Sequence, residues 1–210
     1  MKLDRPCILR TLYLDGMRQS PMVQQLLDKD QIQAKVVEMA ATMAGMVSDP
    51  HRLAVIGIRT RGAILAQRIH HLLAVEREWT MPLGILDITL YRDDLSQLAS
   101  HPLVQKTHLD FDVTGRTVLL IDDVLHTGRT IRSAIDEIID FGRPHAIRLG
   151  VLVDRGGREY PIQPDYAALK TQVAHEQVVR VWMQEVDAEE KVVLTERPPS
   201  QPTGESGDHG

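Results

Sequence analysis

Four segments of this chain are almost entirely apolar, and they constrain its fold more than any other feature. They are LAVIGI (53–58), LGILDITLY (83–91), TVLLI (117–121) and AIRLGVLVD (146–154). Strands that are apolar along their whole length are buried on both faces, as in parallel sheets that helices cover on both sides. We therefore predict an α/β fold in which a mostly parallel central sheet is flanked by helices on both faces.

Three further segments have the periodicity of helices. The first can be capped by Asp28 or Asp30, because a carboxylate accepts from the free N–H groups of a helix start. One apolar face of this helix would be formed by Ile32, Val36, Met39, Met43 and Val47. Residues 62–73 and 130–142 are expected to form the other two helices, with Gly142 ending the last one.

The length of 210 residues fits one domain better than two. We expect a single domain over residues 22–195, which holds the predicted sheet and its helices. Residues 1–21 form an extension of uncertain order, and residues 196–210, rich in Pro, Gly and polar residues, are expected to form a disordered tail.

Charge and composition exclude several classes of protein. The net charge of −5 gives no overall electrostatic case for a nucleic-acid or membrane partner. Cys7 is the single cysteine, so the chain has neither an internal disulfide nor a cysteine metal site. Because no apolar run approaches 18 residues and no secretory signal is evident, we expect a cytoplasmic protein.

Polar segments follow the predicted strands. They are RTRG (59–62), YRDD (91–94), DDVLHTGRT (122–130) and DRGGRE (154–159). Ligands of open α/β sheets bind beyond the carboxyl ends of the strands, so these segments are the candidate site.

Two aspartates and a glycine-containing turn follow the third strand. Asp122 and Asp123 do not belong to a Walker-type nucleotidase, because no Gly-Lys pair occurs in the chain. Thr127 to Thr130 offers backbone N–H groups, hydroxyls and a helix N-terminus, which together suit a phosphate monoester. A ribose 5-phosphate fits both halves, since its hydroxyls can donate to the carboxylates.

The RTRG turn is a second candidate anion site. Arg59 and Arg61 lie in a strand-to-helix turn closed by Gly62, and the dinucleotide pattern G-x-G-x-x-G is absent. An arginine-bearing turn of this kind is often only a solvated loop. Beside a ribose-phosphate site it would suit a diphosphate on the anomeric carbon.

Several motifs together resemble one family. VLLIDDVLHTGRT (118–130) resembles the thirteen-residue phosphoribosyl-diphosphate (PRPP) motif of type I phosphoribosyltransferases. GIRTRG (57–62), LDITLYRDDL (86–95), GRP (142–144) and VLVDRGGRE (151–159) are similar in order and spacing to the PyrR family, whose members regulate pyrimidine operons and are uracil phosphoribosyltransferases. The similarity covers roughly residues 28–187. It implies the type I phosphoribosyltransferase fold with a flexible flap or hood, and the conversion of uracil and PRPP to UMP and diphosphate with Mg²⁺ carried by PRPP.

The resemblance also implies roles for particular residues. Asp122, Asp123 and Arg61 would be catalytic, and Thr60, Arg61 and Gly62 would bind the leaving diphosphate. The remaining nucleotide-binding residues would be Val124, Leu125, His126, Thr127, Gly128, Arg129 and Thr130. No protein side chain is expected to hold a metal ion by itself.

A flap and a base pocket are implied in the same way. Tyr91, Arg92 and Asp93 would begin a mobile flap that ends near residue 106, although a solvated charged loop is an equal alternative. Val153, Asp154 and Arg155 would bind the base, with backbone groups reading the uracil edge. Asp154 and Arg155 can also be interpreted as a structural ion pair.

His126 occupies a motif position where relatives carry an aromatic or apolar residue, and we interpret it as a neutral loop histidine rather than a titrating one. His51, His70 and His71 have no metal-ligand geometry and receive no function.

An RNA-binding attenuator that senses uracil nucleotides is the alternative function. Glu38, Ala41, Gly157 and Gln163 stand where the family is expected to carry RNA-contacting basic or hydrogen-bonding residues, so RNA binding is possible but doubted. The family also implies a homodimer or a higher homo-oligomer. No membrane partner is expected.

Overall fold

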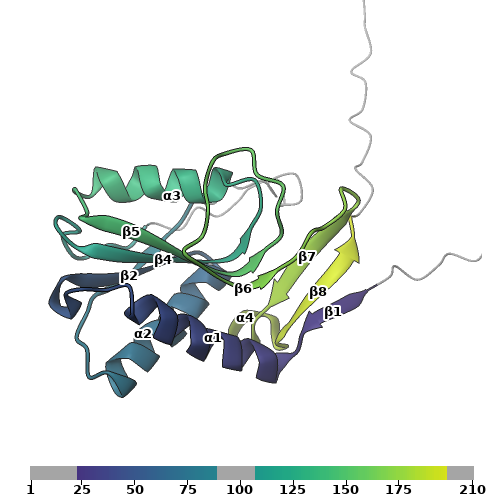
Figure 1. Ribbon diagram of the computed structural model, residues 1–210, viewed down its shortest axis with the longest axis horizontal. Coiled ribbons are helices and arrows are strands. Elements are labelled where there is room, and N and C mark those ends of the chain that lie inside the picture. The colour runs from purple at the N-terminus through teal and green to yellow at the C-terminus, as the bar shows by residue number, and fades with distance from the viewer. Residues whose placement is uncertain (1–22, 89–106, 198–210) are drawn as a thin grey trace, which may run out of the picture.

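The computed structural model describes residues 23–88 and 107–197, and its centre is a parallel sheet of five strands in the order β3-β2-β4-β5-β6 (Figure 1). The strands are β2 (Leu53–Ile58), β3 (Leu83–Leu86), β4 (Thr117–Leu125), β5 (Ala146–Asp154) and β6 (Tyr166–Lys170). Each neighbouring pair is parallel. The predicted α/β class with a parallel central sheet is therefore confirmed.

Helices cover both faces of this sheet. In Figure 1, α3 (Arg129–Asp140) lies above the sheet, and α1 (Lys29–Ala44) and α2 (Arg61–Glu76) lie below it. A short 3-10 turn, η1 (Pro50–Arg52), leads into β2. Two separate apolar clusters fill the two faces, one beneath α1 and α2 and one beneath α3. Within the described part of the chain, no helix is long and apolar enough to cross a bilayer.

The first helix begins with a reciprocal cap. The Gln31 N–H donates to Asp28 Oδ1 over 2.8 Å, and the Asp28 N–H donates to Gln31 Oε1 over 2.9 Å. Each bond satisfies a donor that the helix start leaves free, so Asp28 rather than Asp30 is the cap. The helix ends at Ala44. Val47, which the periodicity placed on the apolar face of the helix, therefore lies after the end of the helix.

A second, antiparallel sheet was not predicted. Its order is β1-β8-β7, with β1 (Gln24–Leu27), β7 (Gln177–Trp182) and β8 (Lys191–Glu196), and the short helix α4 (Gln184–Asp187) joins β7 to β8. We call β1, β7, α4 and β8 the hood. Figure 1 shows the hood beside the end of the parallel sheet. Its last strand includes Glu196, the first residue assigned to the tail.

Two strand limits differ from the expectation. β3 ends at Leu86, well before residue 91. β4 continues past Ile121 to Leu125 because its last residues still pair with β5, including Asp122 with Val151. The aspartate pair therefore belongs to the end of the strand rather than to the turn after it.

Candidate active site

The strand order creates a crevice between β2 and β4. The chain leaves β2 through α2 toward β3 on one side, and it leaves β4 through α3 toward β5 on the other side. Connections that diverge in this way open a crevice at the carboxyl ends of the two strands, where ligands of α/β sheets bind. RTRG and DDVLHTGRT are the two segments that border this crevice.

The two aspartates are not equivalent. Asp122 is 3% exposed, and its Oδ1 accepts the Asp123 N–H over 2.9 Å. Asp123 is partly exposed, and its Oδ1 accepts the Val124 N–H over 2.9 Å. Local N–H donors therefore orient both carboxylates, and Asp123 is the one that solvent or a ligand reaches more easily.

The first turn of α2 lies directly against the end of β4. A Cβ atom at Gly62 would lie 2.7 Å from the Ile121 carbonyl oxygen and 2.9 Å from Asp122 Oδ1. No side chain fits in that space, so glycine is required for this approach. The close contact brings the predicted diphosphate turn beside the predicted ribose carboxylates.

The predicted phosphate turn forms the start of α3. Gly128 has φ +92° and caps α3, which begins at Arg129. Thr127 is buried, and its Oγ1 accepts the Arg129 N–H over 3.3 Å. The turn thus places the N-terminus of a three-turn helix, with its partial positive charge, beyond the aspartates.

The segment from Gly156 to Ile162, which we call the strap, packs against the back of this turn. The N–H groups of Glu159 and Tyr160 donate to the Thr127 carbonyl over 2.9 and 3.0 Å. Arg158 donates to the carbonyl oxygens of His126 and Ile162 over 2.8 and 2.9 Å. The strap therefore holds two consecutive carbonyls of the predicted phosphate turn.

His126 faces the strap. A Cβ at Gly157, where φ is +74°, would come within 3.0 Å of His126 Nε2. The histidine ring therefore lies over a position that only glycine fills without crowding it. This contact agrees with the interpretation of His126 as a packed loop residue.

The side chain of Arg61 is bound to the hood. Its Nε and Nη2 donate to the two carboxylate oxygens of Asp187 over 3.0 and 2.7 Å, and Asp187 also accepts the Met183 N–H over 2.8 Å. Burial alone would raise the pKa of Asp187, but the bonds from Arg61 and Met183 outweigh it and hold the pKa below its usual value. The role predicted for Arg61 in diphosphate binding stays a prediction, and its carboxylate partner was not foreseen.

A second arginine on α2 reinforces this connection. Arg68 donates to Glu185 over 2.9 Å through both Nε and Nη2, and it also pairs with Glu190. Burial would lower the pKa of Arg68, but these carboxylates outweigh it and raise the pKa above its usual value. We call the pairs of Arg61 and Arg68 with Asp187, Glu185 and Glu190 the hood latch.

The other residues of the RTRG turn are also engaged. Arg59 Nε lies 3.9 Å from Asp87 Oδ2, and the Asp87 side chain is only 1% exposed. The Arg59 N–H donates to the Leu86 carbonyl over 2.9 Å. The Arg59–Thr60 peptide is cis.

The predicted base pocket differs in detail from the expectation. The Asp154 carbonyl accepts the Thr171 N–H over 2.9 Å, and the Arg155 N–H donates to the Leu125 carbonyl over 3.1 Å. The Arg155 backbone donor is therefore used within the protein, and Val153 is fully buried within β5.

Asp154 and Arg155 do not pair with each other. Asp154 Oδ1 lies 2.7 Å from Arg158 Nη2 and accepts the Gly156 N–H over 3.0 Å. Arg155 is 9% exposed and donates to the Gln177 carbonyl of the hood over 3.2 Å. Burial, with a smaller contribution from the charge of Arg197, lowers the pKa of Arg155. The alternative of an Asp154–Arg155 ion pair is wrong, because the partner of Asp154 is Arg158.

The flap residues Tyr91, Arg92 and Asp93 lie outside the described residues. Over residues 23–88 and 107–197, no group of three or more His, Cys, Asp and Glu side chains is placed to hold a metal ion. His70 Nε2 lies 2.9 Å from the Met81 carbonyl, a contact that fixes the ring within the fold.

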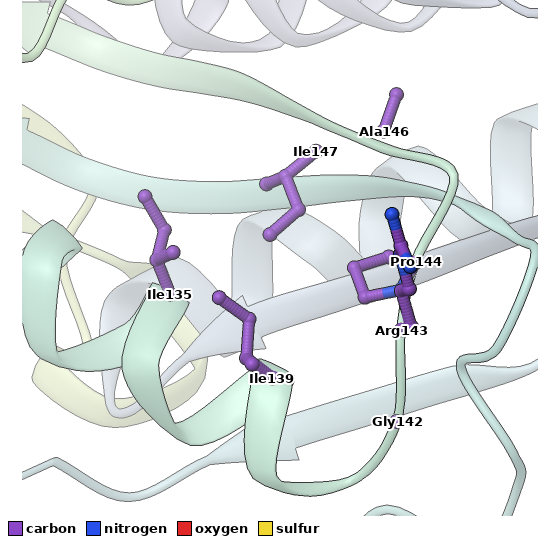
Figure 2. Close-up of a pocket in the computed structure, with 7 residues that line it drawn as sticks. All are labelled: Ile135, Ile139, Gly142, Arg143, Pro144, Ala146 and Ile147. Carbon is purple, nitrogen blue, oxygen red and sulfur yellow. The ribbon is translucent and has the colours of Figure 1, made fainter.

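An apolar groove lies at the opposite edge of the sheet. It is lined by Ile135, Ile139, Gly142, Arg143, Pro144, Ala146 and Ile147, at the end of α3 and the start of β5 (Figure 2). The candidate site is at the other end of both elements, so the two are separate.

Known proteins are similar to this chain over most of its length. A family model described as "Phosphoribosyl transferase domain" matches residues 22–188. The "Bifunctional protein PyrR" of Pelotomaculum thermopropionicum is 45% identical over 172 residues, which cover 82% of this chain and 95% of the relative. This chain belongs to the PyrR family of phosphoribosyl transferases. The protein of the same name from Thermus thermophilus is 50% identical over 145 residues, 69% of this chain and 80% of the relative.

Solved structures support the fold. The hypoxanthine phosphoribosyltransferase of Trypanosoma cruzi has a TM-score of 0.60 at 16% identity, covering 84% of this chain and 97% of that one. The HGPRT-ase of Leishmania tarentolae in complex with GMP has a TM-score of 0.61 at 14% identity, with coverages of 84% and 97%. At these identities the likeness shows a shared fold alone.

Two residues that contact the candidate site were not identified from the sequence. Arg158 and Asp187 contact the predicted phosphate and diphosphate segments, and neither was singled out. Arg158 lies inside the quoted stretch DRGGRE, so its proximity to the site was a usable signal. Asp187 lies at the end of α4 in the hood, and no motif in the sequence pointed to this residue.

Proposed function

We propose that this chain is a uracil phosphoribosyltransferase that converts uracil and PRPP to UMP and diphosphate. The observation that carries the proposal is the arrangement at the carboxyl ends of β2 and β4. There, a phosphate-binding helix start at Thr127 to Arg129 and the carboxylates of Asp122 and Asp123 adjoin, in a chain of the PyrR family.

The carboxylates suit the chemistry of the reaction. When diphosphate leaves the anomeric carbon, positive charge develops on the ribose ring, as in other glycosyl transfers. Asp122 and Asp123 accept bonds from the 2- and 3-hydroxyls and place negative charge near the ring. Donors already orient both side chains, so little reorganisation is needed during the reaction.

The phosphate and diphosphate ends of PRPP would occupy opposite sides of the carboxylates. Thr127, Gly128, Arg129 and Thr130 bind the 5-phosphate. Thr60, Arg61 and Gly62 bind the leaving diphosphate, with Arg61 held in place by Asp187. Val124, Leu125 and His126 complete the nucleotide-binding segment.

Mg²⁺ enters as part of the substrate, bound to the diphosphate of PRPP. Asp122 lies beside Gly62 of the diphosphate turn, and the carboxylate oxygens of Asp122 and Asp123 are of the kind that Mg²⁺ prefers. The ion supplies charge neutralisation of the leaving diphosphate.

Base recognition is proposed at the ends of β5 and the strap. Val153, Asp154 and Arg155 border the crevice beside β4, with which Asp154 is paired at Leu125. The segment that begins with Tyr91, Arg92 and Asp93 is proposed to close over the bound substrates, which would limit hydrolysis of PRPP.

The test is an assay of the full chain with uracil, PRPP and Mg²⁺, following UMP and diphosphate. We expect UMP formation with uracil, and much slower turnover with orotate, hypoxanthine or guanine at equal concentration. Absence of UMP at ordinary enzyme concentrations would overturn the proposal, and preference for another base would reassign the substrate.

A second candidate function is binding to the leader RNA of pyrimidine genes, because the relatives carry the name "Bifunctional protein PyrR". Glu38, Ala41, Gly157 and Gln163 are all exposed and supply no positive charge. In α1, Glu38 pairs with Lys35 over 2.8 Å, which further reduces the positive charge there.

We expect the enzyme to bind such RNA weakly. The test is a titration of labelled leader RNA with and without UMP, at low and high salt. Tight, salt-sensitive and sequence-selective binding would establish the regulatory function despite these four residues.

A further inference from the structure

Arg158 contacts three residues: one before the phosphate turn, one at the end of β5 and one within the strap itself. Its Nη1 donates to the His126 carbonyl over 2.8 Å, its Nε donates to the Ile162 carbonyl over 2.9 Å, and its Nη2 lies 2.7 Å from Asp154 Oδ1. The side chain is 15% exposed, and that of Asp154 is 13% exposed. Charged hydrogen bonds in such partial burial are stronger than those on an open surface.

The bond to His126 sets the direction of the next backbone donor. In a trans peptide the carbonyl and the N–H point in opposite directions. Because the His126 carbonyl points to Arg158, the N–H of Thr127 in the same peptide points away from the strap. That N–H is directed to the side of the turn where the 5-phosphate is proposed to bind.

The next peptide is fixed in the same way. The Thr127 carbonyl accepts the N–H groups of Glu159 and Tyr160 from the strap. The N–H of Gly128 therefore also points away from the strap. Arg158 and the strap backbone together align two consecutive N–H groups, and a row of this kind is what binds a phosphate.

We propose that Arg158 is a positioning residue for the 5-phosphate of the ligand. It holds the Thr127 N–H toward the phosphate and links this turn, through Asp154, to the proposed base pocket. This inference rests on the proposed function, and it adds a residue outside the phosphate turn that determines how well the turn binds. The positive charge of the guanidinium also polarises the His126–Thr127 peptide, which strengthens its N–H as a donor.

The experiment compares two ligands that differ only in the phosphate. Calorimetric titration of the full chain with UMP and with uridine gives the factor by which the phosphate increases affinity. The variants are R158M, which keeps an unbranched side chain but removes the guanidinium and its donors, and R158K, which keeps the charge but cannot reach three acceptors together. D154N tests the link, because it removes the charge that anchors Arg158.

The matched control is R148Q. Arg148 also pairs with an aspartate, Asp165, over 3.1 Å, but it lies near the start of β5 and is exposed. Its loss disturbs a similar ion pair without touching the phosphate turn.

We expect R158M to weaken UMP binding by about tenfold, as for the loss of one charged hydrogen bond. The affinity for uridine should stay unchanged. The ratio of UMP affinity to uridine affinity in R158K and D154N should lie between the ratios of R158M and the wild type. In R148Q this ratio should equal that of the wild type. If R158M does not fold, the ratio measured for R158K and D154N decides.

Equal weakening of UMP and uridine, or an unchanged ratio in both R158K and D154N, would overturn the positioning role and leave the proposed function standing. If the wild-type chain binds neither UMP nor ribose 5-phosphate, both the proposed function and this inference are wrong.

Discussion

The phosphate side and the diphosphate side of the candidate site are stabilised by different forces. On the phosphate side, backbone hydrogen bonds and close packing hold the end of β4, the turn before α3 and the strap. On the diphosphate side, the hood latch joins α2 to the hood through arginine–carboxylate pairs whose side chains are up to 44% exposed. The second region should respond more strongly to pH and salt than the first, where backbone bonds accompany the ion pairs Arg158–Asp154 and Arg129–Glu159.

The largest effect is expected from removing a charge on the phosphate side. D122N and D123N should each reduce kcat by about 10²–10³-fold, because the asparagine keeps an acceptor oxygen but not the negative charge that stabilises the transition state. Folding should be retained, since β4 pairs through its backbone. The measurement is the rate of UMP formation together with a thermal melt.

D136N is the control for these two variants. Asp136 lies on α3, 3.4 Å from Arg132, and is 62% exposed. It should leave the rate unchanged. Wild-type rates in both D122N and D123N would show that the carboxylates do not act in the reaction.

Within the hood latch, Glu190 should contribute more to the free energy of unfolding than Glu185. The Glu190 side chain is 4% exposed and that of Glu185 is 44% exposed, although both bind Arg68. E190Q should lower the free energy of unfolding by about 2–3 kcal/mol, because it leaves a partly buried guanidinium short of charge. E185Q should cost about 0.5 kcal/mol.

Urea denaturation of the two variants measures this difference. Equal losses would mean that burial does not distinguish the two carboxylates. A loss near zero in both would show that the hood is held by its apolar contacts alone.

Packing of the diphosphate turn against the end of β4 can be tested at Gly62. G62A should destabilise the fold by about 2 kcal/mol, since the new Cβ would lie 2.7 Å from the Ile121 carbonyl and the backbone there has little freedom to move. G156A is the comparison: a Cβ at Gly156 meets nothing within 4 Å, but φ is +71°, so strain of about 1 kcal/mol is expected. Denaturant midpoints measure both, and a G62A protein as stable as the wild type would contradict the close approach.

A smaller effect than at Glu190 or Gly62 is expected at Asp187, and it should depend on pH. Its pKa in the folded chain lies below the ordinary value of 3.8, so its pair with Arg61 contributes stability above that pH and loses it as pH falls through the folded pKa. Because both side chains are partly exposed, D187N should cost about 1 kcal/mol near neutral pH.

Melting temperatures of wild type and D187N between pH 7 and pH 3 measure this dependence. Their difference should be constant at the upper end and shrink below about pH 4. A difference that grows as the pH falls would contradict a depressed pKa.

Much of the site was accessible from the sequence because it is local. The four apolar segments, the turn at Thr127 to Thr130 and the aspartates each lie within a few residues of a strand end, and strand ends of a parallel sheet converge on one edge. The assignment of individual contacts to PRPP and uracil stays a prediction.

The resemblance implied a flap or hood, but the strands and contacts of the hood were not predicted, because its pairs are distant in the sequence. β1 and β8 come from opposite ends of the described chain, and each is short. Neither the strand pairing nor the partners of Arg61 and Arg68 have any local signal, since ion pairs between distant segments depend on how the chain folds back.

By itself, the sequence determined the parallel sheet and the residues at its ligand-binding edge, because apolar periodicity and turn chemistry act over short distances. Only the tertiary structure decided which neighbours hold those residues. It assigned Asp154 to Arg158 instead of Arg155 and assigned Arg61 to Asp187. Such contacts arise when separate segments meet in space, so they depend on packing geometry that no single segment contains.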